Sequence, residues 1–181
     1  MIPMTPADGL GYCECPLCHA WADGGEVFWR HGSQFAERPD GKLVCITSES
    51  LFHCINTVAR ALKDLYPDAR VGTYAYSAYS HPPSFSIEPN VFIQTTTAYR
   101  RTPMPLQEQL ETFHAMGVQS GIRAYWSVYQ WDWDGPAITG ELSLPRLLND
   151  IRFYHANNVR SLNTEMNCNW GPRGLGYYLA A

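Results

Sequence analysis

Three carboxylates follow short apolar runs that predict β-strands: Asp8, Asp132 and Glu165. Carboxylates that converge from different strand ends can hydrolyse a glycosidic bond, because one acid protonates the leaving oxygen while the other acts as base or nucleophile. Asp in such loops is also a common turn former, so the residue type alone leaves both roles open. We expect Glu165 to be one catalytic carboxylate and Asp8 or Asp132 to be its partner.

Aromatic and amide side chains accompany these carboxylates near the ends of the predicted strands. Aromatic rings stack on the apolar faces of sugars, while amides and phenols form hydrogen bonds with hydroxyl groups. Three other aromatics, Tyr74, Tyr125 and Trp126, fall inside their strands, so we expect them to fill the core instead. The residues predicted to bind a carbohydrate ligand are Tyr76, Gln94, Tyr129, Trp131 and Trp170.

Cys13, Cys15 and Cys18 form a C-x-C-x-x-C motif near the start of the chain. Thiolates at this spacing can converge on a soft ion such as Zn²⁺, with His19 or Cys168 as the fourth ligand. Zinc sites usually present two ligand pairs, and the second pair is missing from this sequence. Disulfides and free buried thiols are therefore open alternatives to a zinc-stabilised structural domain.

Helices and strands alternate along the chain and must position these groups. Apolar residues at three-and-four spacing predict a helix over 48–66, with Ser48 as its N-cap. Two further helices are predicted over 105–117 and 143–158, each with a proline near its start. Strands are predicted at 1–5, 69–77, 90–97, 122–129 and 159–163.

Strands that alternate with helices become parallel neighbours joined by right-handed crossovers, which gives a doubly wound sheet or a (β/α) barrel. We expect one α/β domain over 1–181, of the (β/α) TIM-barrel type. About five strands are predicted, so the chain would supply only the C-terminal half of an eight-stranded barrel, and its N-terminal half would be missing. Residues 9–46 are expected to form a long loop excursion over the barrel mouth.

The composition argues against some function classes and favours one class of ligand. With 13 Lys and Arg against 17 Asp and Glu, the formal net charge is −4, and no concentrated basic face for nucleic acid is found. No run of about eighteen apolar residues predicts a membrane span. Six Trp and eleven Tyr with only 17% charged residues place many aromatics at surfaces or clefts, which favours a polyhydroxylated ligand.

Several short segments follow one another in a characteristic order. They are Asp8-Gly9, Tyr12 to Cys18, Asn56 to Ala59, Tyr66 to Asp68, Ala75-Tyr76, Pro82-Pro83, Pro89 to Val91, Leu144 to Leu147 and Asp150 to Tyr154. No single segment is specific, but their order along almost the whole chain is. In this order the chain resembles domain of unknown function 4838, a set of bacterial proteins similar to α-glucuronidase-type and hexosaminidase-type glycoside hydrolases.

The resemblance implies a TIM barrel with a role in polysaccharide breakdown, in full-length proteins that are secreted or lipid-anchored. It implies no proven catalytic residue, so the roles of Glu165, Asp8 and Asp132 depend on their positions in the chain. The leading hypothesis is a fragment of a glycoside hydrolase that acts on a poly- or oligosaccharide. A non-catalytic carbohydrate-binding barrel is the alternative, and a zinc-stabilised structural domain is the third.

Overall fold

A computed structural model describes residues 1–6, 12–125, 137–138, 141–142 and 144–165. Its main element is a five-stranded sheet in which every neighbouring pair of strands is parallel. Across the sheet the strands are β1 (Ile2–Pro3), β5 (Val71–Ala75), β6 (Val91–Thr96), β7 (Gln119–Tyr125) and β10 (Val159–Glu165). The prediction of a parallel α/β fold is confirmed.

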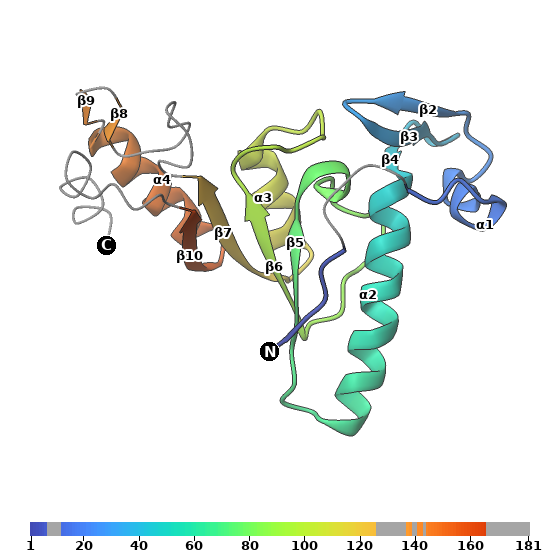
Figure 1. The fold of residues 1–181 in the computed structure, drawn as a ribbon, viewed down its shortest axis with the longest axis horizontal. Helices are drawn as coiled ribbons and strands as arrows, with labels where there is room; N and C mark the ends of the chain where they lie inside the picture. The colour runs from blue at the N-terminus through green and yellow to red at the C-terminus, as the bar shows by residue number, and fades with distance from the viewer. Residues whose placement is uncertain (7–11, 126–136, 139–140, 143, 166–181) are drawn as a thin grey trace.

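The strands have the same order across the sheet as along the chain (Figure 1). A doubly wound sheet reverses this order at a switch point, whereas a (β/α) barrel adds each strand beside the last one. The described strands follow the second pattern but do not close, so the barrel type stays a prediction. A separate antiparallel pair, β8 (Ala137–Ile138) and β9 (Glu141–Leu142), follows β7 in the chain and precedes the helix Leu144–Ala156.

Three helices cover one face of the parallel sheet: α2 (Ile46–Leu65), α3 (Leu106–Ala115) and α4 (Leu144–Ala156) (Figure 1). Successive residues of a strand point to opposite faces, and those that face the helices are mostly apolar. The larger core contains Phe52, Ile55, Val71, Ile93 and Phe113, and the smaller one contains Leu110, Ile122 and Ala124. The helices therefore stabilise one face, and the other face is left for polar side chains.

The first turn of α2 differs from the prediction. The helix begins at Ile46, directly after Cys45, so Ser48 as its N-cap is wrong. Ile46 is fully buried against the segment that precedes the helix, and these apolar contacts extend the helix beyond the residue that the sequence suggested as a cap. Although α2 has 20 residues, neither it nor another helix of the described ranges is long and apolar enough to cross a membrane.

The segment expected as a loop excursion over 9–46 has regular structure where it is described. It contains α1 (Pro16–His19), the 3-10 helix η1 (Ala20–Ala22), and an antiparallel sheet of β2 (Val27–Arg30), β3 (Ser33–Glu37) and β4 (Leu43–Cys45). The turn between β2 and β3 is His31-Gly32, with φ of 52° and 77°. Two positive φ angles are typical of the type I′ turn, which matches the twist of paired strands.

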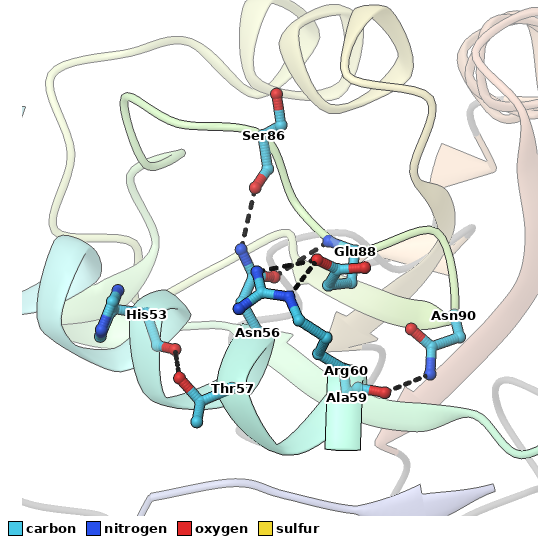
Figure 2. Close-up of polar contacts among 8 residues, drawn as sticks. All are labelled: His53, Asn56, Thr57, Ala59, Arg60, Ser86, Glu88 and Asn90. Atoms are coloured by element: carbon cyan, nitrogen blue, oxygen red, sulfur yellow. Dashed lines mark hydrogen bonds and ion pairs between the residues drawn. The ribbon is translucent and has the colours of Figure 1, made fainter. Parts of the chain in front are cut away.

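Polar side chains tie the loop before β6 to α2 (Figure 2). The Asn56 amide donates to Ser86 O at 2.8 Å and accepts from Glu88 N at 2.9 Å. Asn90 Nδ2 donates to Ala59 O at 2.8 Å. Asn56 and Asn90 lie in two of the segments that carry the family resemblance, and in these two segments the asparagines hold the backbone in place.

Candidate functional site

A cavity of about 210 Å³ opens at the carboxyl ends of the parallel strands, on the sheet face away from the helices; we call it the Glu165 cavity. Side chains two residues apart on a strand reach this same face, because strand residues alternate between faces. The lining residues are Thr5, Pro6, Tyr74, Tyr76, Tyr79, Thr96, Arg123, Tyr125 and Glu165. All five strands contribute, directly or through the residues that follow them, and this is where parallel α/β proteins usually bind ligands.

Glu165 is paired with Arg123 in this cavity. Arg123 Nη2 lies 2.5 Å from Glu165 Oε1, and Nη1 of the same guanidinium donates to Asn163 Oδ1. The neighbouring strands β7 and β10 align Asn163 with Arg123 and Glu165 with Tyr125. The side chains of Arg123 and Glu165 are 22% and 40% exposed, so a polar ligand can reach both the cation and the carboxylate.

Four tyrosines line the Glu165 cavity. Burial, followed by the nearby Glu165 and Tyr76, raises the pKa of Tyr125 well above its usual value. Its hydroxyl therefore stays protonated at neutral pH and can donate a hydrogen bond. The Tyr125 ring meets Tyr99 edge-on at a centroid distance of 5.2 Å, and Tyr76 meets Tyr79 in the same way at 6.1 Å. Rings with hydroxyls suit a ligand that has both apolar faces and polar groups.

Two residues beside the Glu165 cavity have a left-handed backbone. Ser77, directly after Tyr76, has a φ of 47°, and Tyr99, which contacts Tyr125, has a φ of 57°. This conformation costs a residue with a side chain about 1–3 kcal/mol, and such residues cluster at functional sites. Ser77 O accepts a hydrogen bond from Arg101 N at 3.1 Å, which helps to hold the strained turn. The strain supports a ligand-binding role for this edge of the sheet.

A second cavity, of about 280 Å³, lies on the same sheet face toward the amino ends of the strands. Gln94 lines this cavity together with Phe92 and Met1. Thr5 and Tyr74 line both cavities, so the two are neighbours. Gln94 is thus beside the Glu165 cavity and not in it.

A comparison with protein families decides where the chain belongs. The family model described as Domain of unknown function (DUF4838) matches residues 1–181. The chain belongs to this family. No curated protein and no solved structure matches the chain. The function of this DUF4838 chain is therefore argued from the geometry of its site.

The DUF4838 chain carries a second group of reactive side chains, at Cys13, Cys15 and Cys18. Their Sγ atoms all lie within 4.8 Å of one another, close enough to hold a metal ion. Cys15 is the N-cap residue of α1, so the helix start brings Cys18 back toward it. Of the two residues considered as a fourth ligand, His19 does not belong to this group and Cys168 lies outside the described residues. The three cysteines are free thiols.

The three thiols influence one another's protonation. A hydrogen bond from the Cys18 peptide, assisted by the Cys13 side chain, lowers the pKa of Cys15 to about 7. Ser50 lowers the pKa of Cys18, but burial and the two neighbouring thiols outweigh it, so the pKa of Cys18 is raised. Cys15 therefore loses its proton more readily than Cys18, and the thiolate is the form that binds a metal.

The structure brings two predicted site residues of the DUF4838 chain together. Glu165 and Tyr76 line the Glu165 cavity, and Gln94 lines its neighbour. The other predicted site residues lie outside the described part of the chain: Asp8, Tyr129, Trp131, Asp132 and Trp170.

The sequence reasoning missed polar groups inside the strands. Tyr74 and Tyr125, expected to fill the core, are half-buried and line the Glu165 cavity on the sheet face away from the helices, whereas Trp126 lies outside the described residues. Arg123 was not among the predicted residues at all. The signal for it is the alternation in β7, where Ile122 and Ala124 are buried against the helices and the charged Arg123 shares a face with Tyr125.

Proposed function

We propose that this DUF4838 domain binds a carbohydrate in the Glu165 cavity and hydrolyses a glycosidic bond there. The observation that carries this proposal is the position of Glu165, which shares one cavity with four tyrosines and Arg123. Tyrosine rings suit the apolar faces of a sugar, while hydroxyls, a guanidinium and a carboxylate suit its hydroxyl groups. Its place at the carboxyl ends of parallel strands further supports a ligand site.

In this proposal Glu165 acts as the base or nucleophile, because its ion pair with Arg123 involves the ionised carboxylate. The general acid is Asp8 or Asp132, both outside the described residues. A carboxyl separation of about 5 Å would predict retention of configuration, and roughly 6.5–9.5 Å would predict inversion. The fold that we propose around the site is a (β/α) barrel to which this sheet contributes about half of the strands.

A domain that binds carbohydrate without cleaving it is the second proposal. Among the residues that the structure describes, Glu165 is the only carboxylate in the cavity, and Arg123 contacts one of its oxygens. Hydrolysis needs two carboxyl groups, whereas binding needs only aromatic and hydrogen-bonding side chains. This observation favours binding if neither Asp8 nor Asp132 reaches the cavity.

The variant Glu165→Gln separates the two proposals. Wild type, the variant and the control Glu108→Gln, an exposed residue of α3, are tested on a glycan panel for binding by calorimetry and for release of reducing ends. Hydrolysis that is lost in Glu165→Gln but kept in the control, with binding retained, supports the hydrolase. Binding without any hydrolysis by the wild type supports the binding domain. If the wild type binds no glycan, both proposals are contradicted.

We also propose Zn²⁺ as the ion that Cys13, Cys15 and Cys18 hold. The support is the spacing of their Sγ atoms, all within 4.8 Å of one another, since zinc binds thiolates at about 2.3 Å. A bound ion would cross-link α1 to the residues before it and stabilise this segment. Metal analysis of protein purified without reducing agent, with thiol titration, should find one zinc per chain and three protected thiols. Three reactive thiols or a disulfide among them would contradict zinc.

A further inference from the structure

Cys15 and Cys18 lie one helical turn apart at the start of α1. Cys15 is the residue that precedes the helix, and His19 N donates a hydrogen bond to Cys15 O at 3.0 Å, which closes the first turn. Residues three apart in a helical turn have Cα atoms about 5 Å apart, as the rise and radius of the helix dictate. Disulfides join residues whose Cα atoms are about 4.4–6.8 Å apart, so this turn can hold a disulfide with little movement of its backbone.

The sulfur atoms of this turn are close together and within reach of solvent. Cys15 and Cys18 are half-buried, Cys13 is exposed, and all three are free thiols. Their Sγ atoms lie within 4.8 Å of one another, so rotation of the side chains can bring two of them to bonding distance. Accessible cysteines with a second thiol beside them are the ones that peroxides convert to disulfides.

Two other described cysteines lie outside this group of three. Cys45 is fully buried at the end of β4, and its Sγ donates to Ala78 O at 3.3 Å. Cys54 is exposed on α2, where it offers an oxidant an accessible thiol without being part of the group. Cys54 is therefore the natural control for reactivity that depends on exposure alone.

We propose that hydrogen peroxide oxidises Cys15 and Cys18 to a disulfide and that this modification releases the zinc ion held by the three cysteines. In the first step one sulfur attacks the peroxide, the O–O bond breaks, and a sulfenic acid and hydroxide form. The second sulfur then attacks the first, the S–S bond forms, and a second hydroxide leaves. The two sulfurs lose two electrons to the peroxide oxygens, and two protons from solvent convert the two hydroxides to water.

The disulfide and the bound ion exclude each other. Zinc binds the thiolate form of cysteine, which neither sulfur of a disulfide has. Oxidation of Cys15 and Cys18 thus removes two of the three thiolate ligands and leaves only Cys13. This inference rests on the zinc proposal above and deepens it, because it assigns to one turn of α1 the control of whether the ion stays bound.

The experiment follows zinc and thiols together in the full chain loaded with one equivalent of Zn²⁺. One equivalent of hydrogen peroxide is added, free zinc is measured with a chromogenic indicator, and the peptide that contains residues 13–18 is analysed by mass spectrometry. We expect release of the zinc, loss of two titratable thiols and loss of two hydrogens from this peptide. Cys54→Ser is the matched control and should release zinc like the wild type.

Two variants of the metal-free chain assign the pair. Cys13→Ser retains both cysteines of the turn, so its peptide should still lose two hydrogens. Cys18→Ser should form no disulfide in the time that the wild type needs for complete reaction, and its sulfenic acid should be trapped by dimedone. A disulfide that is absent from Cys13→Ser, or that forms equally fast in Cys18→Ser, would overturn the assignment to Cys15 and Cys18.

The outcomes separate this inference from the zinc proposal. If zinc binds and stays bound after peroxide, with no disulfide formed, the inference is wrong and the zinc proposal stands. If zinc is released while the peptide keeps its hydrogens, the disulfide is not the cause and the inference is also wrong. If the chain binds no zinc at all, the zinc proposal is wrong and the inferred release is wrong with it.

Discussion

Arg123 Nη2 lies 2.5 Å from Glu165 Oε1, across β7 and β10 at the carboxyl edge of the sheet. Because both side chains are partly exposed, solvent screens the pair and it contributes only about 0–1 kcal/mol to the free energy of unfolding. The contact is more important for positioning the two side chains than for stability, because it holds a carboxylate oxygen and a guanidinium at a fixed place in the Glu165 cavity. Stability and ligand binding should therefore respond differently when the pair is broken.

Replacing Arg123 by Gln removes the cation and leaves the shape of the side chain roughly similar. We expect glycan binding, or hydrolysis where it is detected, to weaken by about tenfold to a hundredfold, since hydrogen bonds to charged groups contribute about 1.5–3 kcal/mol. The free energy of unfolding should change by less than about 1 kcal/mol. Calorimetric titration and urea denaturation measure the two effects.

The control for this variant is a second arginine–glutamate ion pair, in which the arginine side chain is 62% exposed against 22% for Arg123. Arg60 Nη2 of α2 lies 2.9 Å from Glu88 Oε1 in the loop before β6 (Figure 2), and neither residue lines the Glu165 cavity. Arg60→Gln should change stability by a similar small amount and leave glycan binding as in the wild type. Equal loss of binding in both variants would mean that Arg123 acts only through the fold.

Asn56 should be much more important for stability than its neighbour Thr57. Asn56→Ala removes two hydrogen bonds to the backbone of the loop before β6, so we expect the free energy of unfolding to fall by about 1–3 kcal/mol. Thr57 is exposed and its hydroxyl donates to His53 O in its own helix (Figure 2), so Thr57→Ala should stay within about 0.5 kcal/mol of wild type. Chemical denaturation of the two variants checks the difference.

The lowered pKa of the buried His81 leads us to expect a loss of stability in mild acid. Burial lowers the pKa of His81 from its usual 6.5 to about 4, so between these values the unfolded chain takes up a proton that the folded chain does not. Stability due to this group is therefore unchanged above pH 6.5 and falls as the pH drops toward 4, by roughly 3 kcal/mol in total. Thermal melting from pH 7 to pH 4 should show this fall in the wild type and a smaller one in His81→Gln.

The contribution of the buried Glu49 to the pH dependence of stability must be separated from that of His81, because burial raises the pKa of the Glu49 carboxyl group. A raised carboxyl pKa has the opposite consequence, since stability then falls as the pH rises from its usual value. Glu49 is present in both proteins, so the difference between their melting curves reports on His81 alone. If this difference does not depend on pH, His81 is not the responsible group.

Gly121 should tolerate no side chain without a change in its neighbour Ser161. A Cβ at position 121 would lie 2.3 Å from Ser161 Oγ and 3.1 Å from Phe92 Cζ. We expect Gly121→Ala to reduce the free energy of unfolding by about 1–3 kcal/mol, as overpacked sites do. The double variant Gly121→Ala/Ser161→Ala should recover part of this loss, because it removes the nearest atom. Absence of any recovery in denaturation experiments would place the strain elsewhere.

Elements with a local apolar period could be predicted from the sequence. The helix expected over 48–66 is α2 (Ile46–Leu65), and the helix expected over 105–117 contains α3 (Leu106–Ala115). β7 begins at Gln119, three residues before the predicted strand start at 122. Its first residues do not form an apolar run, and they join the strand because they pair with β6. Such pairing depends on distant parts of the chain, so a local pattern does not contain it.

The sequence could predict only those residues of the candidate site that lie at the ends of strands. Glu165 and Tyr76 lie at or just after strand ends, and parallel strands bring such positions to one edge. Alternation along a strand separates two sets of residues, but it does not say which set the helices cover. For this reason the alternation in β7 does not distinguish a core position from a cavity position for Tyr125, which lines the Glu165 cavity. The antiparallel sheet also escaped prediction, because its strands have only three to five residues and the first of its two turns is the dipeptide His31-Gly32.

In the described part of the chain, helices cover only one face of the parallel sheet, and this has a consequence for how the domain can change. In β6, Val91 and Ile93 are buried in the helix-side core, whereas Phe92 and Gln94 line a cavity on the opposite face. Neighbouring positions of one strand thus have different roles. Val91 and Ile93 stabilise the folding core, whereas Phe92 and Gln94 are placed to contact a ligand. Substitutions at every second position can therefore alter which molecule is recognised while the folding core keeps its composition, so one scaffold of this kind can serve many ligands.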